Sequence, residues 1–133
     1  MKYLFPILLF LVCCNLSQGQ NAASVQKRNL SLYQEALNLS QQGNSTRSKQ
    51  LLSDILKSDS TFYMAFFALA DLSHESGNSA EEASYLGKGL KLAGDSYPAG
   101  YKFLAEILFR NGEYGEALSN INHFAKLKKS FYL

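Results

Sequence analysis

The sequence predicts an all-α fold, a solenoid of antiparallel helix pairs with about six helices. Apolar residues recur at three- and four-residue spacing along most of the chain, which is the period of an amphipathic helix. A glycine followed by a polar residue interrupts this pattern three times, at Gly43, Gly77 and Gly112. These glycines are 34 and 35 residues apart. Three two-helix units in register at that period indicate a repeat protein.

The clearest unit lies in residues 101–124. Tyr101, Leu104 and Leu108 share one face of a predicted helix. Gly112 then predicts a tight turn with positive φ. The apolar pattern resumes after this glycine with the same period, so a second helix folds back on the first.

We expect six helices, with boundaries uncertain by ~2–4 residues, at 29–42, 45–58, 61–76, 79–93, 98–110 and 114–128. The segment 59–61, Asp-Ser-Thr, offers a cap for the third helix. Gly94 suits the end of the fourth helix and Pro98 the first turn of the fifth. Gly87 and Gly89 lie inside the fourth helix, where each costs about 1 kcal/mol relative to Ala. We expect close packing against a neighbouring helix to explain them.

Residues 1–19 read as a secretory signal peptide. Lys2 supplies a positive charge, and an apolar run follows from Tyr3 to about Cys14. The run is shorter than the ~20 residues that a membrane-spanning helix needs. Small residues before Gln20 predict cleavage after Gly19 and a secreted or periplasmic protein. Residues 20–28 form a short polar leader, and the three repeats span 29–62, 63–97 and 98–133.

The two cysteines leave an alternative open. Cleavage after Gly19 removes both, so the mature chain has no disulfide. The segment 11–14, Leu-Val-Cys-Cys, resembles a bacterial lipoprotein box, in which Cys14 is lipidated and becomes the N-terminus. It departs from that pattern at Cys13, where a small residue is expected. An uncleaved anchor is a third alternative.

Charge and motifs exclude several classes of function. The chain has 13 Lys and Arg against 11 Asp and Glu, and removal of Lys2 leaves 12 against 11. This balance lacks the concentrated basic face that nucleic-acid binding needs. His74 and His123 are well separated, so neither predicts a metal site. No catalytic triad or phosphate loop is present, and Glu81-Glu82 suit a first helical turn. We therefore expect no enzyme activity, no cofactor, no metal, no nucleic acid and no membrane span after signal cleavage.

The repeated units resemble the tetratricopeptide repeat family over residues 29–128. The third copy matches best, with Tyr101, Leu104, Ala105, Leu108, Gly112, Tyr114 and Ala117. The second copy has Phe66, Leu69, Ala70, Gly77 and Ala83, and the first has Leu32, Ala36, Leu39 and Gly43. The first copy departs at Glu35 and Ser48, where the family favours Leu and Ala. This resemblance implies a right-handed solenoid.

The resemblance further implies a concave groove that takes an extended or helical segment of a protein partner. The groove positions carried over from the family are Tyr33, Leu37, Met64, Phe67, Asp71, His74, Lys102, Glu106, Phe109 and Arg110. We expect an interaction module outside the cytoplasm. The alternative is a sensor or regulatory portion of a larger exported or envelope signalling assembly.

The groove set predicts a particular kind of ligand. Some family members grip a terminal carboxylate with basic and amide side chains. Leu37, Asp71 and Glu106 stand where amides would help, so we expect no carboxylate clamp. The aromatic and methionine members of the set predict an apolar anchor residue in the ligand. The alternative is that some of these aromatics belong to the core.

The C-terminal edge also lacks a cover. In a solenoid each unit covers the apolar flank of the unit before it. After Lys129 only residues 130–133 remain, too few for another helix. Either this tail folds back as a plug, or the flank stays open for a homodimer or a partner helix, or the chain is a fragment of a longer array.

Overall fold

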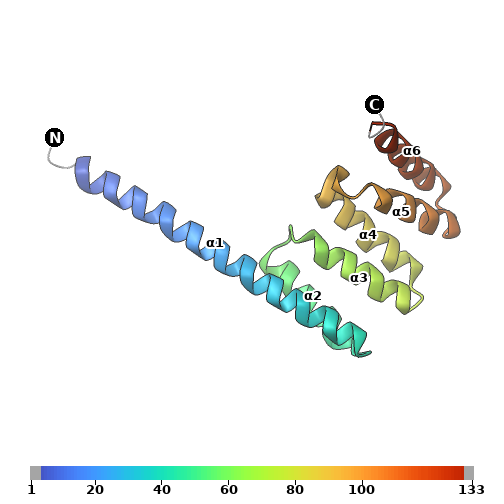
Figure 1. The fold of residues 1–133 in the computed structure, drawn as a ribbon, viewed down its shortest axis with the longest axis horizontal. Helices are drawn as coiled ribbons and strands as arrows, with labels where there is room; N and C mark the ends of the chain where they lie inside the picture. The colour runs from blue at the N-terminus through green and yellow to red at the C-terminus, as the bar shows by residue number, and fades with distance from the viewer. Residues whose placement is uncertain (1–3, 131–133) are drawn as a thin grey trace.

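The computed structural model describes residues 4–130, with side chains from Ala22 onward. This part of the chain is all helical and forms a row of packed helices (Figure 1). The elements are α1 (Leu4–Gln41), α2 (Ser45–Ser58), α3 (Tyr63–Glu75), α4 (Ser79–Ala93), the short 3-10 helix η1 (Gly94–Ser96), α5 (Pro98–Arg110) and α6 (Tyr114–Ser130). The predicted all-α fold of about six helices is confirmed.

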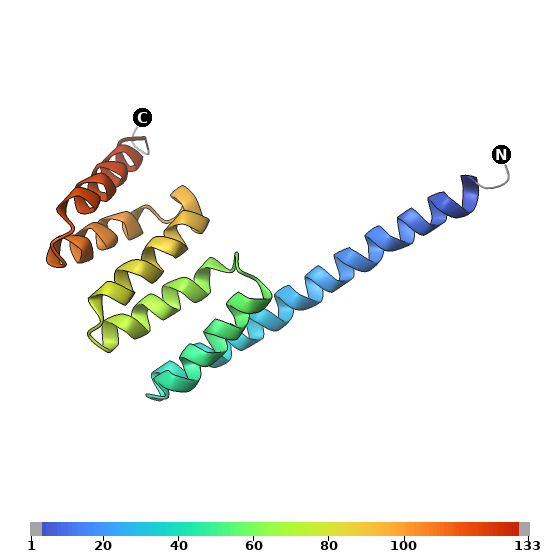
Figure 2. The same ribbon diagram turned by 180° about the vertical axis from the view of Figure 1, so that it is seen from behind.

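The helices pack as three hairpins in chain order. α1 packs on α2, α3 on α4 and α5 on α6, and the hairpins join through the α2–α3 and α4–α5 contacts. Figures 1 and 2 show the stack from opposite sides, with α1 extending beyond it as a single long rod. Packing between sequence neighbours is the arrangement expected of a solenoid.

The first helix is much longer than the predicted range 29–42. α1 begins at Leu4 and continues without a break to Gln41. Residues 20–28 contain neither glycine nor proline, so no residue there ends the helix. Every side chain in 22–28 is exposed, and burial in α1 begins at Asn29. Residues 1–3 and the proposed plug residues 131–133 lie outside the described part of the chain.

Three equivalent turns close the hairpins. Gly43, Gly77 and Gly112 have φ values of 78°, 73° and 85°, a region that other residues rarely adopt. At the second turn the Gly77 N–H donates to the His74 carbonyl (2.9 Å) and the Asn78 N–H to the Ser73 carbonyl (2.9 Å). The same pair of bonds recurs at the other two turns. This is the Schellman pattern, in which a glycine satisfies the last carbonyls of a helix.

The residue after the glycine also starts the next helix. The Asn44 side chain accepts from the Arg47 N–H at 3.3 Å, and the Asn78 side chain accepts from the Glu81 N–H at 3.2 Å. Each asparagine therefore ends one helix through its backbone and caps the next through its side chain. Because each turn is tight, the two helices that it joins run antiparallel.

The prediction of a side-chain cap before the third helix is wrong. The Asp59 carboxylate accepts from the Thr61 N–H at 2.9 Å, which closes a turn ahead of α3. The residue that precedes α3 is Phe62, and its side chain makes no capping bond. Phe62 is instead buried in the core between α1, α2 and α3. Apolar burial thus decides where this helix begins.

Two apolar clusters form the interior, and α3 contributes to both. The first contains Ala36, Leu51, Leu52, Ile55, Phe62, Ala65, Ala68, Leu69 and Leu72. The second contains Ala70, Ala83, Leu86, Leu90, Leu104, Ile107, Leu108 and Ala117. Because α3 is shared, the stack has one continuous interior and not three separate hairpins.

The departure at Ser48 has a local explanation. Ser48 is buried, and its hydroxyl donates to the Ala36 carbonyl of α1 at 2.8 Å. The hydroxyl is therefore satisfied inside the core. Serine is small enough for the close approach of α1 and α2 that alanine would otherwise serve.

The two glycines inside α4 differ in their surroundings. A Cβ on Gly89 would lie 2.4 Å from the Phe67 ring of α3, closer than packed atoms allow. A Cβ on Gly87 would meet only Leu104, at 3.7 Å, an ordinary contact. The expected close packing is therefore found at Gly89.

This difference gives a matched pair of substitutions. Gly89→Ala should lower the free energy of unfolding by about 1–3 kcal/mol, because the Phe67 ring must move. Gly87→Ala should raise it by about 0.5–1 kcal/mol through helix propensity. Urea unfolding followed by circular dichroism measures both. Stabilisation by both substitutions would contradict the close α3–α4 contact.

Candidate binding groove

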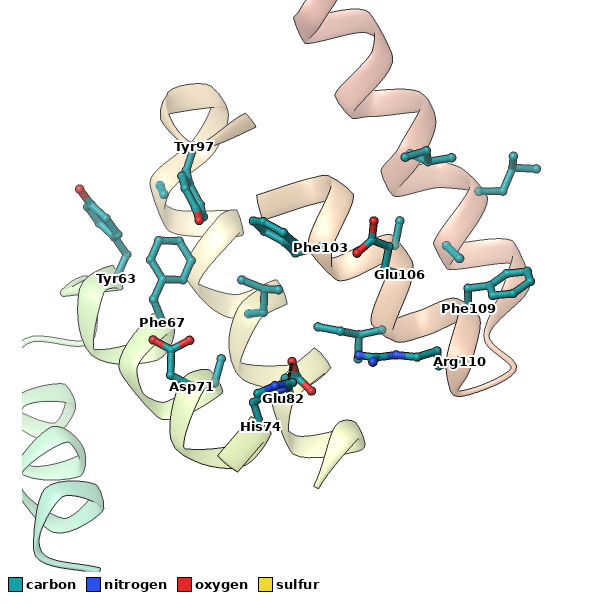
Figure 3. Close-up of a pocket in the computed structure, with 18 of the residues that line it drawn as sticks. Tyr63, Phe67, Asp71, His74, Glu82, Tyr97, Phe103, Glu106, Phe109 and Arg110 are labelled. Carbon is teal, nitrogen blue, oxygen red and sulfur yellow. Dashed lines mark hydrogen bonds and ion pairs between the residues drawn. The ribbon is translucent and has the colours of Figure 1, made fainter. Parts of the chain in front are cut away.

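A groove of about 1260 Å³ runs across α3, α4, α5 and α6 (Figure 3). Its walls are mostly apolar, with a few charged side chains pointing inward. Concave apolar sites with a few placed polar groups are the usual form of ligand sites. The groove has three parts, which differ in chemistry.

Four side chains form the aromatic end of the groove: Tyr63, Phe67, Tyr97 and Phe103. The Tyr63 and Phe67 rings lie one turn apart on α3 with centroids 5.7 Å apart. The Tyr97 ring lies 5.3 Å from the Phe67 ring. Gly89 lets Phe67 lie against α4, and Gly100 leaves room for Tyr97, since a Cβ there would lie 2.7 Å from its ring.

The central part carries three carboxylates. Glu82 is buried, and its Oε1 lies 3.0 Å from the Nδ1 of His74. Glu106 pairs with Lys102 at 3.6 Å. Asp71 has no hydrogen-bond or ion-pair partner among the described residues. Partial burial raises the pKa of Asp71, as do the neighbouring carboxylates of Glu75 and Glu82, whereas His74 acts to lower it.

The far part is the open flank, formed by Phe109, Tyr114, Leu118 and Ile121 of α5 and α6. Phe109 is 65% exposed, Tyr114 63% and Leu118 61%. The Phe109 and Tyr114 rings meet edge to face at 5.3 Å. Such a cluster of large apolar side chains is unusual on a free surface and marks an interaction site.

The structure brings together six of the ten predicted groove residues. These six are Phe67, Asp71, His74, Glu106, Phe109 and Arg110. Lys102 does not line the groove, although it pairs with Glu106 at the rim. That these residues bind a partner stays a prediction.

Three further predicted residues, two from the first repeat and one from the start of the second, do not line the groove. Tyr33, Leu37 and Met64 are partly buried against the first apolar cluster. The Tyr33 ring packs on Phe62 with centroids 5.7 Å apart. Burial of their apolar area stabilises the core between α1, α2 and α3. For Tyr33 this is the alternative stated in the sequence analysis, that some of the predicted groove aromatics belong to the core.

The sequence interpretation missed Tyr63, Glu82, Tyr97 and Phe103. Tyr63 precedes Phe67 by one helical turn, so the helical period could have found it. Glu82 was read only as a favourable charge in the first turn of α4, where it does lie. Tyr97 stands between helices, and its place beside Phe67 depends on tertiary packing.

The two histidines lie in different places. His74 lines the groove, whereas the Nε2 of His123 lies 2.9 Å from Asp95 and its ring packs on Tyr101. The described residues hold no group of three His, Cys, Asp or Glu able to bind a metal ion. Within residues 22–130, whose side chains the structure describes, no helix is both long and apolar enough to cross a membrane.

Comparison with known proteins identifies the fold. No protein-family model matches the chain, and no curated protein matches it. Among solved structures, the chain is similar to the type III secretion translocator chaperone SycD of Yersinia enterocolitica, with a TM-score of 0.63 and 20% identity. The similarity covers 77% of this chain and 75% of that chain. The chain thus has a helical repeat-like fold that resembles the fold of this chaperone.

The unpaired Asp71 predicts a pH-dependent effect on stability. Its pKa is raised in the folded state, so its charge destabilises the fold above that pKa and has no effect below its unfolded value. Asp71→Asn should therefore raise the free energy of unfolding at pH 7, by less than about 1 kcal/mol because Asp71 is only partly shielded from solvent. The gain should vanish near pH 3.

Glu35→Gln, at an exposed position on α1 outside the groove, is the matched change of charge. Glu35→Gln should leave the free energy of unfolding unchanged at pH 7 and near pH 3. Denaturant titrations of the three proteins provide the measurement. A loss of stability in Asp71→Asn at pH 7 would show that Asp71 has a stabilising partner in the free protein.

Proposed function

We propose that this chain is a non-enzymatic interaction module that binds a peptide or helical segment of a partner protein in the groove. The observation that carries this proposal is the groove itself, an apolar channel across four helices with an exposed aromatic end and an open flank. The fold is similar to that of a type III secretion translocator chaperone. This likeness supports a protein partner.

We further infer that the helix pairs are three tetratricopeptide-like repeats. The three hairpins close through the same turn, with the same two backbone bonds and a left-handed glycine. A repeated turn of identical geometry at a period of 34 and 35 residues supports repetition of one unit.

We propose that the protein acts outside the cytoplasm after cleavage at Gly19. The N-terminal charge, apolar run and small-residue site support this location. Side chains 22–28 are all exposed, and burial in α1 begins at Asn29. Cleavage before Gln20 would therefore remove none of the packing described for the helix pairs. Lipidation at Cys14 is the competing route.

The open flank is the natural place for a partner helix or for a second copy of the chain. Burying a large apolar side chain contributes about 1.5–3 kcal/mol. Covering Phe109, Tyr114, Leu118 and Ile121 together would therefore give a substantial driving force. The flank continues directly into the groove, so one bound segment can contact both.

Processing can be tested by intact-mass analysis of the exported protein. We expect a mature chain that begins at Gln20 and carries no lipid. The reason is that the small residues at the end of the 1–19 segment suit a signal peptidase. A mature N-terminus at Cys14 with acyl chains would replace this proposal with a membrane-anchored lipoprotein.

Partner binding can be tested with a matched pair of leucines. Leu118 lies in the groove flank, and Leu92 is an exposed leucine of α4 that does not line the groove. Leu118→Glu should reduce capture of the specific partner from extracts of the producing cells by tenfold or more, because a charge would be buried at the contact. Leu92→Glu should leave capture unchanged.

Sedimentation of the same proteins separates the two kinds of occupant. Dimerisation of the wild type that Leu118→Glu abolishes would identify a second copy as the partner. A wild type that stays monomeric at high micromolar concentration would indicate that the partner at the flank is a different protein. Equal capture by wild type and Leu118→Glu would contradict binding in this groove.

A further inference from the structure

The aromatic end of the groove has a chemistry that the rest of the groove lacks. Tyr63, Phe67 and Asp71 follow one another at four-residue spacing, so they lie along one face of α3. Figure 3 shows the three side chains in a row on α3, with Tyr97 beside Phe67. Exposed ring surface and a carboxylate therefore occupy one short stretch of the wall.

We propose that this end of the groove holds a basic side chain of the partner segment, an arginine or a lysine. The cation would lie against the rings of Tyr63, Phe67 and Tyr97, with the Asp71 carboxylate as its counter-ion. The inference rests on the proposed function, since it names the chemistry of the segment that the groove takes.

Ring faces attract cations. Aromatic rings bind an ammonium or guanidinium group on their electron-rich faces, most strongly when water is excluded. Tyr63 is 39% exposed and Tyr97 40% exposed, so ring surface at this end is open to a ligand. Phe103 of α5 adds a further exposed ring to the same end of the groove.

The charges of the groove favour a cation at this end. Three carboxylates line the groove, from Asp71, Glu82 and Glu106, against the one guanidinium of Arg110. With histidine neutral, that is one positive and three negative charges, a net charge of −2. Arg110 is the last residue of α5, about two helical turns beyond Phe103. An anionic ligand group is therefore disfavoured beside Asp71.

An apolar side chain fits this end less well than a basic one. It would cover the rings, but it would also remove water from Asp71 without giving that carboxylate a partner. A buried carboxylate without a hydrogen-bond or charge partner is costly. A lysine or arginine meets both needs, because its methylene stem packs on the rings while its cation pairs with Asp71.

The probe is a random peptide library displayed on phage. The full chain is immobilised through an N-terminal biotin, because the N-terminal part of α1 projects away from the helix stack (Figure 1). We expect the selected peptides to share one arginine or lysine flanked by apolar residues. The best peptide is then synthesised with its basic residue and, separately, with glutamine in its place.

The affinities of the two peptides are measured for wild type, Asp71→Asn and Tyr97→Leu. Either substitution should weaken binding of the basic peptide about tenfold and change binding of the glutamine peptide less than threefold. Glu35→Gln, at an exposed position of α1 outside the groove lining, is the control for general charge. It should change binding of either peptide less than threefold. Circular dichroism confirms the fold of each variant.

Two outcomes overturn the inference in distinguishable ways. Selected peptides that lose affinity for Leu118→Glu, yet contain no shared basic residue, would refute the basic-residue site and leave the groove function intact. Basic peptides that bind Asp71→Asn and Tyr97→Leu as tightly as wild type would do the same. Selected peptides that no groove substitution affects would overturn the proposed function as well.

Discussion

The structure depends on three tight turns that each need a glycine with positive φ. Gly43, Gly77 and Gly112 meet this need, and the residue after each one continues the turn. At two of the turns that residue is an asparagine whose side chain caps the next helix. The reversal of the chain at every hairpin thus depends on only a few neighbouring residues. The apolar faces of the helices then meet in pairs, and the pairs stack because each leaves one face uncovered.

The contact between α3 and α4 contributes both to the stability of the fold and to the shape of the groove. Gly89 brings the two backbones close, and the Phe67 ring occupies the space that a side chain there would need. The ring packs on Tyr97 on one side and Tyr63 on the other. One close contact therefore holds two helices together and presents the aromatic end of the groove. This is why Phe67 is a poor position for a test of binding alone, and why exposed residues such as Leu118 serve better.

Two features of the groove stand out in the free protein. Asp71 has no partner among the described residues, and its pKa is raised by burial and by neighbouring carboxylates. The large side chains of the open flank face water. Neither feature is explained by the packing of the helices. Both are explained by a partner segment that brings apolar side chains to the flank and a cation to Asp71, which is the basis of the binding proposal.

The sequence by itself determined the helices, the turns and the solenoid, because these follow from local period and from glycine stereochemistry. The five helices after the first turn were predicted to within two residues at each end. The tertiary structure alone decided which residues line the groove. Tyr33, Leu37 and Met64 have the right helical period, yet the first apolar cluster draws them toward the core. Tyr97 lies beside Phe67 in the groove because Gly89 leaves room for the Phe67 ring and Gly100 for the Tyr97 ring. The direction a side chain takes on a half-buried face depends on which neighbour covers it, and that neighbour lies far away in the sequence.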